Sequence, residues 1–200
     1  MAESLPQNFN HLKIHTQYSI CEGAIKIDDL QEYSKNNKIK SLGLCDTSNL
    51  CGALEFAEKI SKSGTQPIIG TQINFKIHDT IGLLPLNALN EIGYKTIIDL
   101  SSESYLKNDE LSDPHLTLDY LLNNSEGIAL FSGTVFGLFG QLFDKGKFTE
   151  IHDSYDKIKS KFGDRFYIEI QRHKDLNENS FEKFNLKKIF RFRDTNNCYK

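Results

Sequence analysis

The stretch Phe9-Asn-His-Leu-Lys-Ile-His-Thr-Gln-Tyr-Ser-Ile-Cys-Glu-Gly23 begins with a predicted strand near His11–His15. In a strand, side chains two residues apart lie on the same face, so Lys13 and His15 share a face. Two imidazoles at such positions would converge on one divalent ion, whereas the ammonium group of Lys13 repels a cation. We therefore expect Lys13 to fill space beside His15 without binding a metal ion.

The composition predicts an ordinary globular protein. Two hundred residues are enough for one hydrophobic core and short for two, so we expect one domain. With 38% hydrophobic residues, 26% charged residues and a net charge of −3, the chain lacks the basic bias of a nucleic-acid-binding protein. No apolar run approaches the roughly 20 residues that span a bilayer, and the N-terminus lacks a signal-peptide pattern. These features predict a cytoplasmic protein with no membrane partner.

Short apolar runs alternate with amphipathic stretches, a pattern typical of a parallel β/α architecture. Strands are predicted near His11–His15, Ser41–Cys45, Pro67–Phe75, Leu83–Leu86, Gly127–Phe131 and Phe166–Ile170. Helices are predicted near Ile27–Asn36, Gly52–Ser63, Leu89–Ser102, Leu116–Asn123, Gly137–Phe143, Thr149–Phe162 and Ser180–Lys188. Pro85 argues against the fourth strand, because proline cannot donate to a sheet ladder. The polar segment Ser104–His115 is predicted to be a surface loop.

Several further segments, taken in order with the opening stretch, carry a family resemblance. They are Leu44–Gly52, Gln66–Gln72, Ala88–Tyr94 with Asp99–Ser102, Glu126–Gly133 and Phe166–Gln171. Over roughly residues 9 to 186 the chain resembles the polymerase and histidinol phosphatase (PHP) domain, in the version that begins the alpha subunit of bacterial DNA polymerase III. The resemblance implies an α/β fold, a distorted (β/α)7-like barrel that lacks its last strand or strands here. It also implies a site at the carboxyl ends of the strands.

Active members of this family use clustered divalent ions to activate water and to offset phosphoryl charge. Carried over position by position, the family's first histidine becomes Lys13, the second is kept as His15, and the acid that follows is replaced by Glu22. In the next motif Asp46 is kept, but Thr47 replaces a histidine.

The remaining ligand positions are altered in the same way. Gln72 replaces a bridging glutamate, Leu83 a histidine, and Thr134 a cysteine or histidine, and the final Asp-x-His is absent. Affinity for a metal cluster should collapse after such losses, so we expect a vestigial site with neither catalytic nor metal-binding residues. One alternative is a single weakly held magnesium ion near Glu22 and Asp46; the other is that these carboxylates satisfy backbone donors. We also expect Lys13 to neutralise Glu22 and Asp46.

The other histidines and the cysteines are expected to have structural or solvent-exposed positions. His11 should pack or cap locally, and His78, His115 and His152 should be solvated. His173, which follows the last predicted strand, is a candidate to line the site. The four cysteines form no Cys-x-x-Cys pair, and we expect them to be buried free thiols. They are Cys21, Cys45, Cys51 and Cys198.

Residues 1–187 are expected to form the PHP domain and residues 188–200 an aberrant tail. Where the family has a strand of the type Ile-Pro-Ile-Ile-Ala-Thr-Asn, this chain reads Lys188-Ile-Phe-Arg-Phe-Arg-Asp-Thr-Asn-Asn-Cys-Tyr-Lys200. With A/T-rich codons, reading one nucleotide later restores Ile-Pro-Ile-Ile-Ala-Thr. We interpret the chain as a frameshifted or truncated product; the alternative is an unrelated, poorly ordered terminus.

Three functions are compatible with the resemblance. The first is an N-terminal fragment of a replicative polymerase alpha subunit, a catalytically inactive PHP domain that supports the polymerase and docks the proofreading exonuclease subunit. Its partners would be the remainder of the alpha subunit and the exonuclease. This segment would contact DNA only as part of the full-length polymerase. Magnesium would be bound by the polymerase module of the parent protein, and no cofactor is expected in this segment. The second is a free-standing metal-dependent PHP phosphoesterase, and the third an adaptor unrelated to replication. No phosphate-binding loop, nucleophile elbow or dinucleotide-binding turn is present.

Overall fold

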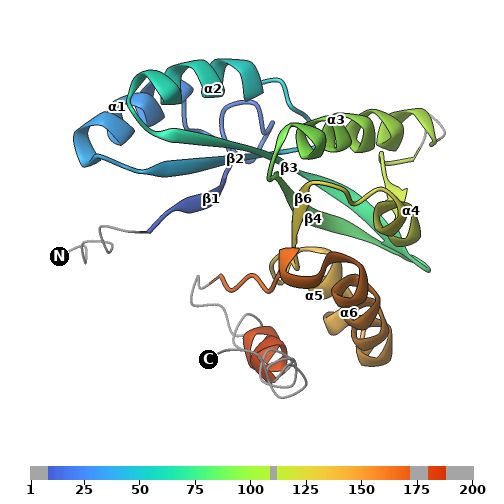
Figure 1. Ribbon diagram of the computed structural model, residues 1–200. Helices are drawn as coiled ribbons and strands as arrows, with labels where there is room; N and C mark the ends of the chain where they lie inside the picture. The colour runs from blue at the N-terminus through green and yellow to red at the C-terminus, as the bar shows by residue number, and fades with distance from the viewer. Residues whose placement is uncertain (1–8, 109–111, 172–179, 188–200) are drawn as a thin grey trace.

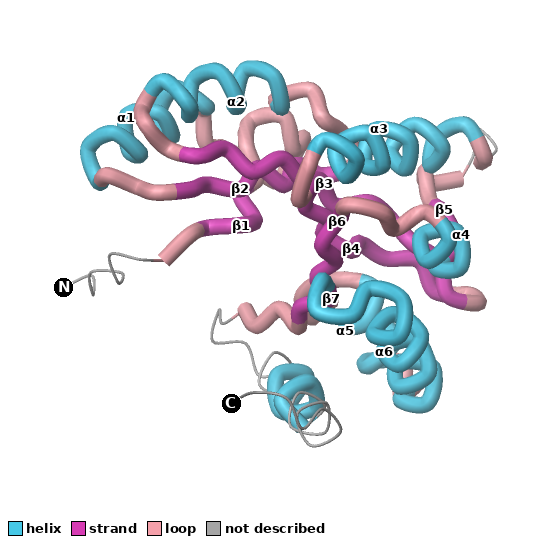
Figure 2. The backbone as a smooth tube through the Cα atoms, viewed as in Figure 1, coloured by secondary structure: helices cyan, strands magenta, loops and turns pink. Residues whose placement is uncertain are grey.

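A curved, mixed sheet organises the chain, which the computed structural model describes over residues 9–108, 112–171 and 180–187. The strands follow the order β1-β2-β3-β4-β6-β7, with β5 paired to β3 beside this path. Their bounds are β1 His11–Ile14, β2 Ser41–Thr47, β3 Gln66–Ile77, β4 Thr80–Ala88, β5 Leu116–Thr117, β6 Ile128–Phe131 and β7 Phe166–Tyr167. Figure 2 shows these strands gathered at the centre with the helices outside them.

The helices cover the sheet in two groups. They are α1 Ile27–Asn37, α2 Ala53–Lys62, α3 Glu91–Leu106, α4 Leu118–Asn123, α5 Leu138–Asp144 and α6 Phe148–Phe162, followed by the 3-10 turn Gly163–Arg165. Residues 180–187 are also helical. In Figure 1, α1, α2 and α3 lie in a row above the sheet, whereas α5, α6 and the helix of residues 180–187 lie near its β7 end.

Two separate hydrophobic clusters hold these layers together. One, centred on Phe75, Leu86 and Phe139, packs α3, α5 and α6 against β3, β4 and β6. The other, which includes Leu44 and Phe56, packs α1 and α2 against β2. The apolar residues of these elements are therefore on the faces that the helical and strand periods of the sequence predict.

The expected parallel arrangement is wrong in the middle of the sheet. β1, β2 and β3 run parallel, as do β6 and β7, but β4 is antiparallel to both β3 and β6. Only His78 and Asp79 separate Ile77 from Thr80, and a parallel crossover needs a dozen or more residues. His78 adopts a positive φ of 51°, which helps the chain to reverse there.

Several element boundaries also differ from the sequence prediction. Pro85 does lie in β4, where it is the register partner of Gln72 in β3, while pairing with β6 covers only Leu86–Ala88, so β6 needs no donor from Pro85. Helix α3 continues to Leu106, beyond the predicted end, because Ser104 is buried against the core rather than in a loop. The predicted helix Leu116–Asn123 begins with the short strand β5, and β7 ends at Tyr167 instead of Ile170.

The expected α/β class with an incomplete barrel is confirmed. Among the described residues, β1 and β7 are the two ends of the sheet, and each pairs with one neighbour only. The sheet therefore stays open between its first and last strands. No helix in the described part of the chain has the length and apolarity needed to cross a bilayer.

The cysteine prediction is correct for only one of the thiols that the structure describes. Cys45 is buried in β2, and burial raises the pKa of its thiol to about 12. Cys21 and Cys51 are exposed, so apolar sequence neighbours did not imply burial there: Ile20, beside Cys21, is itself exposed. Cys198 lies outside the described residues.

Candidate functional site

Six of the eight positions predicted from the resemblance line one cavity of about 260 Å³ near the carboxyl ends of β1 and β6. They are Lys13, His15, Glu22, Gln72, Leu83 and Thr134, joined by Pro85, Gly133, Phe136, Gly137 and Gln171. The other two predicted residues, Asp46 and Thr47, do not line the cavity. The aligned motifs thus meet in space, at the end of the sheet where the resemblance places the site.

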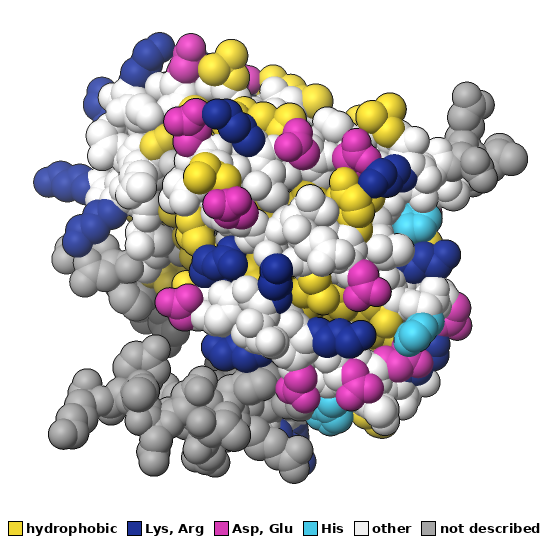
Figure 3. Space-filling model, turned by 45° about the vertical axis from the view of Figure 1, so that its right-hand side comes forward, with side chains coloured by type: hydrophobic (Ala, Val, Ile, Leu, Met, Phe, Trp, Pro, Cys, Tyr) yellow, Lys and Arg dark blue, Asp and Glu magenta, His cyan; other side chains and the backbone are white. Residues whose placement is uncertain are grey.

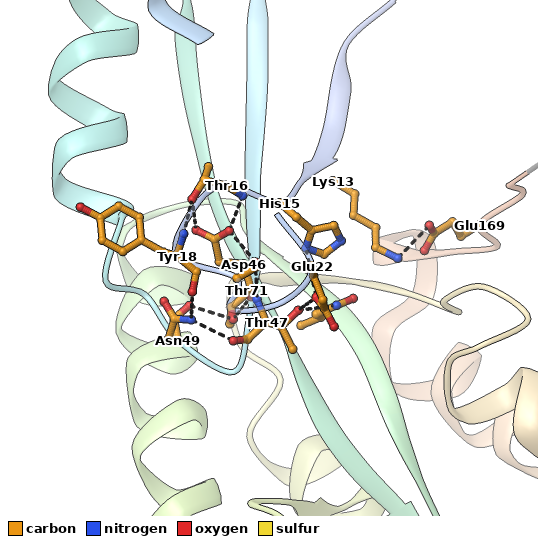
Figure 4. A network of polar contacts seen from close by, with 12 residues as sticks. Lys13, His15, Thr16, Tyr18, Glu22, Asp46, Thr47, Asn49, Thr71 and Glu169 are labelled. Atoms are coloured by element: carbon orange, nitrogen blue, oxygen red, sulfur yellow. Dashed lines mark hydrogen bonds and ion pairs between the residues drawn. The ribbon is translucent and has the colours of Figure 1, made fainter. Parts of the chain in front are cut away.

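Lys13 forms an ion pair with Glu169, a residue that sequence reasoning missed. The Lys13 Nζ to Glu169 Oε1 distance is 3.2 Å, and the two side chains are 23% and 16% exposed. The Glu169 amide donates to Ser132 Oγ at 3.0 Å, which fixes the segment after β7 against the end of β6. Figure 4 shows the Lys13 side chain pointing to Glu169. In the sequence, Glu169 lies between Ile168 and Ile170, and a charged residue inside an apolar run could have indicated a functional or paired position.

The predicted neutralisation of Glu22 and Asp46 by Lys13 is therefore wrong in its partners. The carboxylate that Lys13 pairs with comes from the opposite end of the sheet, across the gap between β1 and β7. The second oxygen of that carboxylate, Glu169 Oε2, is buried without a hydrogen-bond partner. Lys13 thus balances one acid of the site, and the other two are satisfied by different groups.

A chain of hydrogen bonds links Gln72, Thr47 and Glu22 at one side of the cavity. Gln72 Nε2 donates to Thr47 Oγ1 at 2.7 Å, and that hydroxyl donates to Glu22 Oε2. His15 Nδ1 lies 3.9 Å from Glu22 Oε2. Burial, and then the nearby Lys13 ammonium, lower the pKa of His15 below its ordinary value of 6.5. These surroundings therefore favour the neutral form of His15 next to Glu22.

Asp46 lies beneath the cavity and holds the loop that follows β1. Its carboxylate is fully buried and accepts three hydrogen bonds: from Thr16 N at 2.6 Å, Thr16 Oγ1 at 2.7 Å and Ser19 Oγ at 2.7 Å. Ser19 Oγ in turn accepts from Thr47 N at 3.1 Å. Figure 4 shows Asp46 directed at Thr16, away from Glu169. The geometry supports the alternative in which the Asp46 carboxylate accepts hydrogen bonds from donors of this loop.

Leu83 and Thr134 complete the wall of the cavity with groups that are poor metal ligands. Leu83 contributes an apolar surface beside Pro85. Thr134 Oγ1 accepts from the Phe136 amide at 3.3 Å, so its hydroxyl is engaged within its own turn. The Phe136 ring is exposed at the rim. This side of the cavity is therefore mainly an apolar wall.

The other histidines that the structure describes do not line the cavity. The His11 ring contacts Phe9 edge-on at 4.8 Å, which confirms local packing. His78 is exposed, and His115 Nδ1 is 2.8 Å from the Asp113 carbonyl. The prediction of a solvated His152 is wrong, because its ring stacks on Phe184 at 5.2 Å in the contact between α6 and residues 180–187. His173 lies outside the described residues.

The donors present do not fit a multinuclear metal centre. Within the described ranges, no group of three or more histidine, cysteine, aspartate or glutamate side chains is arranged to hold one ion. His15 and Glu22 face the cavity, but the Lys13 ammonium shares it and repels cations. Both oxygens of the Asp46 carboxylate accept hydrogen bonds from Thr16 and Ser19 of the loop after β1.

Comparison with known proteins gives consistent matches. A family model described as the PHP domain matches residues 11–173. The DNA polymerase III subunit alpha of Caulobacter vibrioides is 37% identical over 186 residues, and that of Borreliella burgdorferi is 34% identical over 181 residues. These alignments cover 86% and 85% of this chain, which spans only 16% of the length of either relative. Among solved structures, an amidohydrolase from Chromobacterium violaceum aligns with 47% of this chain and 34% of its own, with a TM-score of 0.37 and 13% identity.

Proposed function

This chain belongs to the PHP domain family, and from that premise we propose that it is the catalytically inactive, N-terminal structural domain of a replicative DNA polymerase III alpha subunit. Relatives of that name support the assignment, since they align over most of the chain. The remainder of the alpha subunit is then its principal partner. That remainder carries the polymerase chemistry and its magnesium ions, in the cytoplasm.

The observation that carries the proposed inactivity is the ion pair between Lys13 and Glu169. The family resemblance implies that active members use divalent metal ions at this end of the sheet to activate water. Here the cation is an ammonium group fixed to β1, which cannot polarise a bound water in that way. The Gln72–Thr47–Glu22 hydrogen bonds support the same conclusion, because they satisfy the remaining acid without a metal.

We further propose that the domain docks the proofreading exonuclease subunit, as the family resemblance implies. A domain without chemistry of its own would then contribute by holding two activities in one complex. Size-exclusion chromatography of the 200-residue chain with a purified exonuclease subunit tests this part separately. Independent elution of the two proteins at micromolar concentration would remove the docking role and leave the structural role standing.

Metal analysis and an enzymatic assay distinguish the proposed inactive domain from the alternative, a free-standing phosphoesterase. The purified chain, dialysed against zinc or manganese, should retain no stoichiometric metal and should hydrolyse neither p-nitrophenyl phosphate nor single-stranded DNA. Two or more tightly held ions per chain, with phosphatase activity that chelation abolishes, would establish the phosphoesterase instead.

A reversion variant provides the matched control for that assay. Lys13→His, Thr47→His and Gln72→Glu together restore three ligand types at positions that already surround or adjoin the cavity. This variant should bind more zinc than the parent chain under the same dialysis, because imidazole and carboxylate donors replace an ammonium, a hydroxyl and an amide. If parent and variant bind equally little, these substitutions are not what removes metal affinity.

A further inference from the structure

Four lysines gather at the end of the molecule where α1 and α2 finish. The segments Ser34–Lys40 and Ser61–Gln66 contain Lys35, Lys38, Lys40 and Lys62 and no acidic residue. The two segments lie side by side, since Gln66 N donates to the Lys40 carbonyl at 2.9 Å and Thr65 Oγ1 donates to the Ile39 carbonyl at 2.8 Å. We call these four lysines the basic end.

The basic end is exposed, and three of its lysines form no ion pair with the described residues. All four lysines are exposed to solvent. The ion pairs of the described residues use other lysines, so Lys35, Lys38 and Lys62 take part in none of them. Figure 3 shows Lys and Arg side chains along the edge of the molecule over α1 and α2. A chain with a net charge of −3 therefore carries a local surface of the opposite sign.

Helix stabilisation accounts for only part of this arrangement. Lys35 and Lys62 lie in the last turns of α1 and α2, where a cation interacts favourably with the helix dipole. Lys38 is the residue after α1, in a left-handed conformation with φ of 50°, and Lys40 is two residues further on. The dipole effect falls off beyond the last turn, so it does not account for the position of Lys38.

We infer that the basic end binds the phosphate backbone of a nucleic-acid duplex. Phosphates are neutralised by lysines with release of counterions, and the ammonium groups need not lose their water. A protein partner is less suited, because lysine is strongly hydrated and is depleted at the centres of protein interfaces. Exposed Tyr33 and Asn36 lie beside it and suit the same contact.

The basic end lies away from the cavity. It precedes β2 and β3, at the amino ends of these strands, whereas the cavity is near the carboxyl ends of β1 and β6. Binding of a duplex at this end does not involve the cavity, so its test is separate from the test of the proposed inactivity. It also differs from the expectation, based on net charge, that DNA is reached only through the rest of a polymerase.

Fluorescence anisotropy with a labelled DNA duplex and the 200-residue chain tests the inference. Three or four phosphate contacts predict a slope of about −3 for the logarithm of the association constant against that of salt concentration, and hence a roughly 60-fold loss between 50 and 200 mM salt. The variant Lys35→Gln, Lys38→Gln, Lys62→Gln should lose most of the binding and flatten the slope. The charge-preserving variant with arginine at the same three positions should retain both.

A second triple variant controls for net charge. Lys95, Lys157 and Lys161 are exposed on α3 and α6, and their change to glutamine alters the net charge equally. It should leave binding nearly unchanged; equal weakening by both triples would overturn the inference, as would undetectable binding of the parent chain at 50 mM salt. Tighter binding of polyglutamate than of duplex would assign the surface to an acidic protein instead. If the first triple fails to fold by circular dichroism, Lys38→Gln alone should reduce the slope by about 1.

Discussion

The ion pair between Lys13 in β1 and Glu169, two residues after β7, connects the two ends of the sheet, which share no backbone pairing in the described part of the chain. Removing either partner leaves a partly buried charge without its counterion, which costs more than the pair contributes. Lys13→Met should lower the free energy of unfolding by about 2 kcal/mol, between the values for exposed and buried pairs.

Urea unfolding of a mutant cycle checks this prediction. Glu169→Gln combined with Lys13→Met should recover a large part of the stability, since the unpaired charge is then gone. A double variant that recovers no stability would mean that Lys13 contributes packing alone.

His15 should make stability depend on pH in a defined direction. Burial and the Lys13 ammonium lower its pKa in the folded protein below the ordinary 6.5. The unfolded chain then takes up a proton first as pH falls, so the contribution of His15 is full above pH 6.5 and is lost below it. Relative to a His15→Asn variant, the parent should lose stability between pH 7.5 and pH 5.5 in urea titrations. Parallel curves for the two proteins would contradict the assigned shift.

The order of the motifs in the sequence predicted which residues line the cavity, but not which charged groups pair there. Lys13, His15, Glu22 and Gln72 come together as the aligned motifs suggested, because the ends of neighbouring strands meet at one edge of the sheet. Glu169 was missed because no motif assigned it a role, and its contact with Lys13 spans almost the whole described chain. Pairing between distant segments depends on how the sheet curves, which local patterns do not encode.

Gly43 tests how tightly β1 lies against β2. A Cβ atom at this position would come within 2.5 Å of the Leu12 carbonyl oxygen and 2.6 Å of its Cα. Both neighbours are backbone atoms, so β1 itself must move. We expect Gly43→Ala to destabilise the protein by about 1–3 kcal/mol, the usual cost of overpacking. Chemical denaturation measures the change, with exposed Ser61→Ala as the control; a tolerated Gly43→Ala would show that β1 is free to shift.

At the scale of elements, periodicity identified nearly every helix and strand, but not their directions. The apolar runs of β3 and β4 were recognised, whereas the two-residue turn between them, His78–Asp79, was not weighed. That turn alone requires an antiparallel pair. The end of β7 was also overestimated, because the segment after Tyr167 leaves the sheet to bring Glu169 to Lys13.

At the scale of the whole molecule, the chain should tolerate loss of its last residues. Residues 188–200 lie outside the described residues, and Ile189, Phe190 and Phe192, interrupted by arginines, fit neither a helix face nor a buried strand. Deleting Lys188–Lys200 should leave the Tm nearly unchanged. Unfolding caused by this deletion would make the tail an integral element and reject the frameshift hypothesis, for which the nucleotide sequence is the direct check.

A longer deletion is the matched control. Within residues 180–187, Phe181 is buried against Phe143, and Asn185 Oδ1 accepts from the buried Tyr155 hydroxyl at 3.1 Å. Deletion from residue 180 onward should therefore lower the Tm strongly, because it uncovers α5 and α6. The two Tm values together locate the end of the folded unit.

The hairpin of β3 and β4 also has a consequence for the order in which the chain folds. Its partners are close in sequence, so it closes at a lower entropic cost than any other pair of strands in the described sheet. We expect φ-values to be highest in this hairpin and near zero at Lys13 and Glu169, which meet only when both ends of the sheet are in place. The cavity would then form after the rate-limiting barrier. A partner bound there would lengthen the lifetime of the folded protein without changing how fast it folds.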